Sequence, residues 1–94
     1  MGKEESYEEK YARIKAQLDE LDWPSIYQFK FIVPNNNDKI NEVKSLFAKK
    51  ADISSRVSKK GTYISLSIKE LLGSSEMVLE KYKLAKNIDG LIAL

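Results

Sequence analysis

The chain has 94 residues with 16 Lys and Arg against 14 Asp and Glu, a formal net charge of +2, no cysteine and no histidine. One domain is expected at this length, and because folding buries only about 60 to 65 per cent of the unfolded chain's surface at this size, there is little room for a deep pocket. The missing residue types exclude disulfides, thiol nucleophiles, thiolate metal sites and histidine-based acid–base catalysis. We therefore expect a non-enzymatic protein without a metal ion or a cofactor.

The start of the chain favours a cytoplasmic location. Met1 leads into the acidic pair Glu4 and Glu5 without an apolar stretch of the signal-peptide kind, and no apolar run approaches 18 residues. We expect no membrane partner.

A first helix is predicted over residues 7–21. Ser6 and Glu9 have the spacing of a capping box, and Pro24 disfavours helix at the residue before it. The apolar residues follow alternating spacings of four and three, which place them on one stripe of a helix: Tyr7, Tyr11, Ile14, Leu18 and Leu21. A stripe this short is consistent either with docking on its own domain or with self-association.

Charge divides the chain near Trp23 and Pro24. Residues 1–22 carry four basic and seven acidic side chains, whereas residues 23–94 carry twelve basic and seven acidic ones. We expect a helical extension over 1–22 and a folded domain over 23–94.

The domain begins with a predicted strand over 26–33, whose period of two places one set of apolar residues on one face: Tyr27, Phe29, Phe31 and Val33. Residues 34–38 then stop the strand and can cap a helix, which we expect to end near Lys49 and Lys50. The apolar face of that helix is Ile40, Val43, Leu46 and Phe47.

Two further strands are predicted over 53–58 and 62–71, joined by a hairpin in which Gly61 supplies the positive φ. The second strand alternates between a polar face and an apolar face of Ile64, Leu66 and Ile68. Residues 73–76 cap a last helix with a buried stripe, and 91–94 form the final strand. The stripe consists of Val78, Leu79, Tyr82 and Ala85.

This order predicts an α+β, ferredoxin-like βαββαβ fold after the first helix. In it, two helices cover one face of a four-stranded antiparallel sheet, and the other face meets water or a partner.

Residue patterns for chemistry are weak. The glycines at 2, 61, 73 and 90 cannot form a dinucleotide or phosphate loop. Carboxylate pairs such as Asp19 and Glu20 are interpreted as a solvated helix face. A Ser–Lys dyad would need a desolvated lysine, which a solvated sheet face does not provide.

A basic cluster surrounds the hairpin, and it opens the possibility of an anionic partner. It consists of Lys49, Lys50, Arg56, Lys59 and Lys60, with only Asp52 opposing it. RNA-binding domains of this fold class stack bases on aromatic residues of the open sheet face, where the alternation places Tyr63. A single aromatic residue is a poor platform, so nucleic acid is the alternative partner and a solvated turn the simpler interpretation of the lysines.

Three segments resemble the YbeD-like family of small proteins labelled as lipoate regulatory proteins. They are the aromatic-Pro entry into the first strand at 23–30 (WPSIYQFK), the hairpin at 58–65 (SKKGTYIS) and the turn at 86–90 (KNIDG). The resemblance covers residues 23–94 and implies a βαββαβ fold related to ACT-type regulatory domains. Trp23 stands where that family usually has Phe.

Only four positions carry over from the hairpin motif: Lys60, Gly61, Tyr63 and Ser65. The lipoate label brings no residue-level chemistry with it, and each of the four also has a structural interpretation as a turn or strand residue. With Arg56, these four form our candidate binding site for a ligand or partner.

We therefore expect a regulatory or binding module that acts through its open sheet face or by self-association. Its expected partner is another protein or a second copy, and a small-molecule ligand held near residues 34–37 is a variant of this hypothesis. Single-stranded RNA or another nucleic acid, bound by the basic hairpin, is the alternative.

Overall fold

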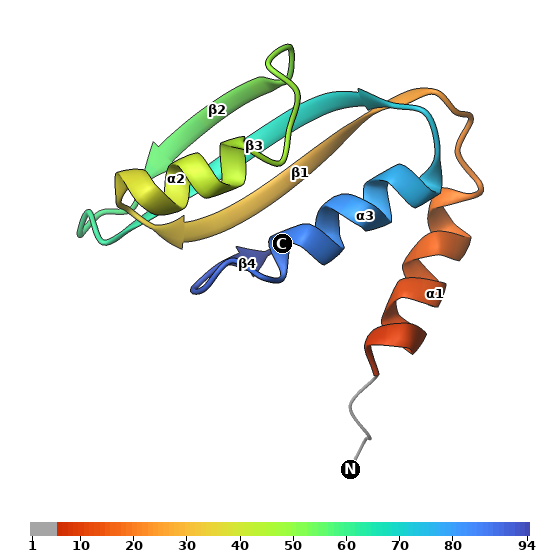
Figure 1. Ribbon diagram of the computed structural model, residues 1–94, viewed down its shortest axis with the longest axis horizontal. Helices are drawn as coiled ribbons and strands as arrows, with labels where there is room; N and C mark the ends of the chain where they lie inside the picture. Colours follow the sequence, from red (N-terminus) through yellow and green to blue (C-terminus); the bar gives the residue numbers. More distant parts are fainter. Residues whose placement is uncertain (1–5) are drawn as a thin grey trace.

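Seven elements follow one another in residues 6–94, the part of the chain described by the computed structural model (Figure 1). They are α1 (Tyr7–Leu18), β1 (Ser25–Pro34), α2 (Asn37–Lys44), β2 (Asp52–Val57), β3 (Tyr63–Leu72), α3 (Ser75–Ala85) and β4 (Ile92–Ala93). The predicted α+β class and the βαββαβ order after the first helix are confirmed.

The four strands form one antiparallel sheet in the order β2-β3-β1-β4. β1 and β3 pair over their whole length, from Ser25 opposite Leu72 to Pro34 opposite Tyr63. β4 adds only two pairs to the other side of β1. The long central pair therefore carries most of the sheet.

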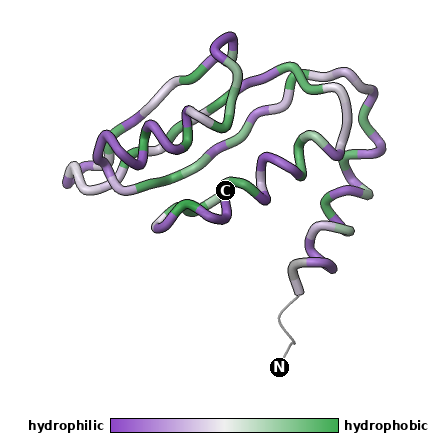
Figure 2. The backbone as a smooth tube through the Cα atoms, in the orientation of Figure 1, coloured by the Kyte–Doolittle hydropathy of each residue, from purple (hydrophilic) through white to green (hydrophobic). Residues whose placement is uncertain are grey.

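One face of the sheet is the core, because the β1 residues that share it are fully buried. Phe29, Phe31 and Val33 have no exposed surface. Gln28, which precedes Phe29, and Lys30, which lies between Phe29 and Phe31, are exposed. The alternation of hydrophobic and hydrophilic residues is visible along the tube in Figure 2. The predicted register of β1 is thus confirmed.

Both covering helices pack on this same face. The Phe29 ring lies 5.1 Å from Phe47, which follows α2, and 5.2 Å from Tyr82 of α3, between ring centroids. The other buried residues of the core are Leu18, Val43, Ile64, Leu66, Ile68, Leu72, Val78, Leu79, Ala85 and Ile88. Within residues 6–94, no helix lies on the opposite face of the sheet.

Two helices end earlier than predicted. α2 ends at Lys44 rather than near Lys49 and Lys50, because the Ser45 hydroxyl donates to the Glu42 carbonyl and tight turns take the chain down to the buried Phe47. The final strand is also shorter than the predicted 91–94.

α1 ends at Leu18 rather than at residue 21. The Ser6–Glu9 capping box begins it as predicted. At the other end, the Trp23 indole N–H donates to the Leu18 carbonyl at 3.0 Å, so the chain has already turned back, and Leu21 is left half-exposed.

Contact between α1 and the domain is concentrated near the end of the helix. Leu18 is buried, whereas Tyr11 and Ile14 are only half-buried, and Figure 1 shows the helix leaning away from α3 toward its N-terminus. Within residues 6–94, no helix combines the length and the apolar character needed to cross a membrane.

Candidate functional site

The uncovered face of the sheet carries the candidate site. Strand alternation places four sets of outward side chains on it: Asp52, Ser54 and Arg56 from β2; Tyr63, Ser65, Ser67, Lys69 and Leu71 from β3; Ile26, Gln28, Lys30 and Ile32 from β1; and Ile92 from β4. We call this surface the open face.

One row of residues crosses the whole sheet near the hairpin. Arg56 lies opposite Ser65, Ser65 opposite Ile32, and Ile32 opposite Ile92. The Ser65 hydroxyl donates to the carbonyl of Arg56 at 3.4 Å, so the pairing is by side chain as well as by backbone.

A shallow groove follows this row and is lined by Ile32, Arg56, Val57, Ser58, Lys59, Tyr63, Ser65 and Ile92. The structure thus brings together three of the five predicted site residues, namely Arg56, Tyr63 and Ser65. Tyr63 is 48% exposed, which leaves its side chain accessible to a ligand.

The other two predicted residues lie at the hairpin tip, outside the residues that line the groove. Gly61 has φ +75°, donates its N–H to the Ser58 carbonyl, and accepts at its own carbonyl from the Asn35 amide. Its geometry is that of a turn residue. Lys60 is exposed beside it, and the groove is lined instead by Lys59, which the motif did not single out.

An apolar pair lies at the opposite end of the open face. Ile26 is directly opposite Leu71, and these side chains are 70% and 65% exposed. The sequence alternation places both residues on the outward, otherwise polar face of their strands, so the pair could have been predicted. The continuous apolar run at the start of β1 made Ile26 look like a buried residue. Sequence reasoning therefore missed this pair.

The middle of the open face is polar and cationic. Lys30 and Lys69 are exposed there and Arg56 is exposed one row closer to the hairpin, with Asp52 as the one outward acidic residue among the described strands. Apolar groups at both ends of a positively charged strip favour an acidic partner with apolar side chains.

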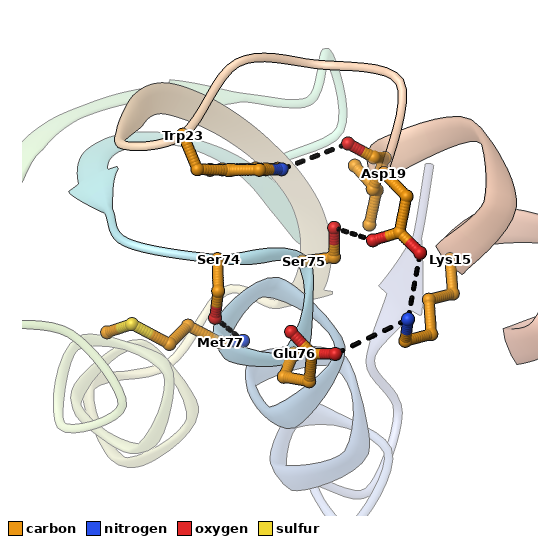
Figure 3. Close-up of polar contacts among 8 residues, drawn as sticks. Lys15, Asp19, Trp23, Ser74, Ser75, Glu76 and Met77 are labelled. Atoms are coloured by element: carbon orange, nitrogen blue, oxygen red, sulfur yellow. Dashed lines mark hydrogen bonds and ion pairs between the residues drawn. The ribbon is translucent and has the colours of Figure 1, made fainter.

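A second polar cluster joins α1 to α3 (Figure 3). The Asp19 carboxylate accepts from the Ser75 hydroxyl and from the Lys15 ammonium, which also lies 3.3 Å from Glu76. These bonds, that from Lys15 first, lower the pKa of Asp19. Asp19 is exposed, as the sequence interpretation of a solvated helix face expected, but that interpretation missed its bond to Ser75, a buried residue distant in sequence.

The sequence model of one family, the proteins of unknown function DUF493, matches residues 19–93. This match spans most of the chain. The chain belongs to the DUF493 family. No match was found among the curated proteins or among the solved structures.

The DUF493 match covers the sheet together with α2 and α3, and begins at Asp19 in the turn after α1. It therefore includes the open face and the groove, while the helix residues 7–18 lie before it. A hollow of about 400 Å³ lies where α1 meets this DUF493 core, lined by Lys10, Tyr11, Ile14, Tyr82, Ala85, Lys86, Leu91, Ala93 and Leu94.

Two further polar contacts hold the DUF493 core from inside. The Tyr27 and Tyr82 hydroxyls lie 3.0 Å apart, and burial raises the pKa of Tyr82. Glu70 accepts from the Ala48 N–H at 2.8 Å and lies 3.7 Å from the Lys81 ammonium. Neither contact faces the groove.

Metal-ligating side chains do not gather in residues 6–94, where no three acidic residues come close enough to hold an ion. The groove offers a guanidinium, an ammonium, a phenol and hydroxyls around an apolar floor. Such a set of groups binds by charge, hydrogen bonding and ring contact.

Proposed function

We propose that this DUF493 protein is a non-enzymatic regulatory or binding module that recognises another protein through its open face or pairs with a second copy of itself. One observation carries the proposal. In the described part of the chain the helices cover one side of the sheet, and the other side exposes apolar residues at both ends of a cationic strip. Exposed apolar residues grouped on a surface mark interaction sites.

The test compares two matched pairs of substitutions in the full chain. Ile26→Ser with Leu71→Ser removes the apolar end of the open face, whereas Met77→Ser with Leu84→Ser removes two exposed apolar residues from α3. In affinity capture from the native host, a specific partner should be held by the wild type and the α3 variant and lost by the open-face variant. Equal capture by all three proteins would refute recognition through this face.

The arrangement of strands supports a finer description of the fold within this proposal. β3 lies between β1 and β2, and β1 lies between β3 and β4, so each βαβ unit is split by a strand of the other. We infer a ferredoxin-like, ACT-related architecture, in keeping with the resemblance of residues 23–94 to YbeD-like proteins. The proposed regulatory role rests on the same resemblance, whereas the proposed cytoplasmic location rests on the sequence pattern described above.

A second candidate function is the binding of single-stranded RNA. The observation that favours it is the convergence of Arg56, Lys59 and Tyr63 on one groove. Cations that contact phosphates and an exposed ring that stacks on a base are the elements of such sites.

RNA binding predicts an affinity that falls steeply with salt and is lost on Tyr63→Ala. Lys59→Ala should weaken it as well, while Lys49→Ala, a charge-matched substitution outside the groove, should not. Binding of a labelled oligonucleotide by fluorescence anisotropy at several salt concentrations measures both effects. Indifference to salt and to Tyr63 would eliminate this function.

A further inference from the structure

The hollow between α1 and the DUF493 core has no part in the function proposed above. α1 is held at its C-terminal end, where Leu18 is buried and Asp19 bonds to Ser75, and it leans away from α3 toward its N-terminus (Figure 1). The two helices therefore diverge, and the hollow of about 400 Å³ lies between them, with Tyr11 and Ile14 half-buried at its side.

The size and the lining of the hollow are those of a small-molecule site. Such sites have volumes of about 300 to 1,000 Å³ and are lined mostly by apolar and aromatic side chains, with a few polar groups that orient the ligand. The apolar and aromatic lining of this hollow comes from both helices and from the residues around β4: Tyr11, Ile14, Tyr82, Ala85, Leu91, Ala93 and Leu94.

Two tyrosine rings line the hollow, one from each helix. Tyr82 belongs to a buried aromatic cluster, with its ring centroid 5.2 Å from that of Phe29 and 6.0 Å from that of Phe31. Its hydroxyl lies 3.0 Å from that of Tyr27, so the ring is what Tyr82 offers to a ligand. Aromatic rings pair favourably with other rings at such distances. An aromatic ligand would extend this cluster across the hollow to Tyr11.

The charged side chains around the hollow are cations. Lys10 of α1 and Lys86, which follows α3, line it, and the Lys83 ammonium lies 6.0 Å from the centroid of the Tyr11 ring. No acidic side chain is among the described residues that line it. A main-chain carboxylate at Leu94 would offset one of these charges and leave the balance positive. Ammonium groups on both sides of the hollow favour a ligand with an acidic group.

We propose that this hollow binds a small anion with an aromatic body, whose rings lie against Tyr11 and Tyr82 and whose acidic group lies beside Lys10 and Lys86. The site is separate from the open face, because it lies between the helices on the other side of the sheet. It also depends on α1, which precedes the DUF493 match, so it is a property of this chain and not of the family core alone.

Fluorescence titration of the full chain tests the class of ligand. The probe is 8-anilinonaphthalene-1-sulfonate, for which we expect one saturable site per chain. N-phenyl-1-naphthylamine, the same ring system without the acidic group, is its matched control. Lys10→Gln with Lys86→Gln should weaken binding of the sulfonate about fivefold or more and leave the neutral probe unchanged. Lys44→Gln with Lys49→Gln, two exposed lysines of a different groove, should change neither.

A pair of substitutions in β4 tests the location. Ala93 lines the hollow, whereas its neighbour Ile92 lines the groove on the open face. Ala93→Phe should fill the hollow and weaken binding of both probes about tenfold or more, and Ile92→Phe should leave both unchanged. Circular dichroism and thermal melts show whether each variant is folded. In amide NMR spectra of the wild type, the sulfonate should shift resonances of residues 10–14, 85–86 and 91–94.

The absence of saturable binding would overturn the inference. So would binding that is lost in Ile92→Phe, with amide shifts at residues 56–65, because the dye would then lie in the groove on the open face. An equal loss of both probes in the variant without Lys10 and Lys86 would show that charge does not select the ligand. Ready displacement of the sulfonate by decanoate, an anion with an aliphatic body, would overturn the aromatic assignment. None of these results bears on recognition through the open face.

Discussion

The Asp19 carboxylate accepts a hydrogen bond from the Ser75 hydroxyl and so joins the end of α1 to the first residue of α3, 56 positions later in the chain. Ser75 is 1% exposed. A buried hydroxyl needs a partner, and this one finds it at Asp19, the residue that follows α1 and begins the DUF493 match. The contact therefore fixes the end of α1 to α3, beside the ion pair of Lys15 with Glu76, as Figure 3 shows.

Removing either partner of this contact should lower the melting temperature. Ser75→Ala deletes the buried donor and Asp19→Ala the acceptor, and the double variant should lose less than the sum of the two, since both delete the same bond. Thermal unfolding of the four proteins measures the coupling. Strict additivity would show that the two side chains act independently.

Acid should loosen the same junction. The pKa of Asp19 is lowered from its ordinary value of 3.8, chiefly by the hydrogen bond from Lys15. The pKa of Glu76 is lowered from its ordinary value of 4.5, first by a backbone hydrogen bond and then by Lys15. A group whose pKa is lower in the folded protein than in the unfolded chain stabilises the fold at pH values above its unfolded-state pKa. This stabilisation is lost as the pH falls through the folded-state pKa. Lys15→Met should therefore flatten the loss of stability below about pH 4.5, whereas Lys44→Met should leave it unchanged; urea unfolding across this range would show the difference.

Alkaline pH should act on Tyr82 in the opposite sense. Burial, and secondly the hydrogen bond with Tyr27, raise the pKa of this phenol above 10.0. Its stabilising contribution is complete below pH 10 and is lost as pH rises toward the folded value, because the unfolded chain ionises first. Tyr82→Phe should be less stable than wild type at pH 7 and should show a smaller further loss between pH 10 and 11. Tyr63→Phe on the open face should follow the wild-type profile.

The core was predictable because it depends on local periodicity. Phe29, Phe31 and Ile68 alternate with polar residues. A shift of the strand pairing by one residue would turn all three side chains to the solvent, so this alternation alone determines which face is covered. Gly61 could be assigned to its turn for a similar reason, since the need for positive φ is local.

The junctions and the groove could not be predicted in the same way. Asp19 is polar on a helix and looks solvated until the fold brings Ser75 to it. Glu70 lies on the inward register of β3, where periodicity calls for an apolar residue, and its partners are on α3 and in the loop after α2. Ile26 and Leu71 become a surface pair only through the β1–β3 register.

Glu70 should be important for stability despite its charge. One carboxylate oxygen accepts from the Ala48 N–H and the other lies 3.7 Å from the Lys81 ammonium, with the Glu70 side chain only 10% exposed. Glu70→Ala leaves the Ala48 N–H without its acceptor and removes the carboxylate beside the Lys81 ammonium, which still donates to the Leu46 carbonyl, so it should cost about 2 kcal/mol in urea unfolding. Glu70→Gln keeps an acceptor for Ala48 and should cost less. Equal losses in the two variants would mean that the bond to the loop contributes nothing.

Gly90 should tolerate substitution least among three glycines of the described chain. It has φ +81°, and a Cβ there would lie 3.1 Å from the Pro34 ring, so Gly90→Ala combines backbone strain with crowding. Gly61, at φ +75°, has nothing within 4 Å of that position and should show the backbone cost alone, about 1 to 2 kcal/mol. Gly73→Ala meets only the flexible Met77 sulfur at 3.4 Å and should be the mildest.

Because Gly90 turns the chain into the two-residue β4, hydrogen exchange should report faster opening of the Ile32–Ile92 pair in Gly90→Ala but not in Gly73→Ala. Protection of that pair at wild-type levels in Gly90→Ala would show that the turn does not control β4.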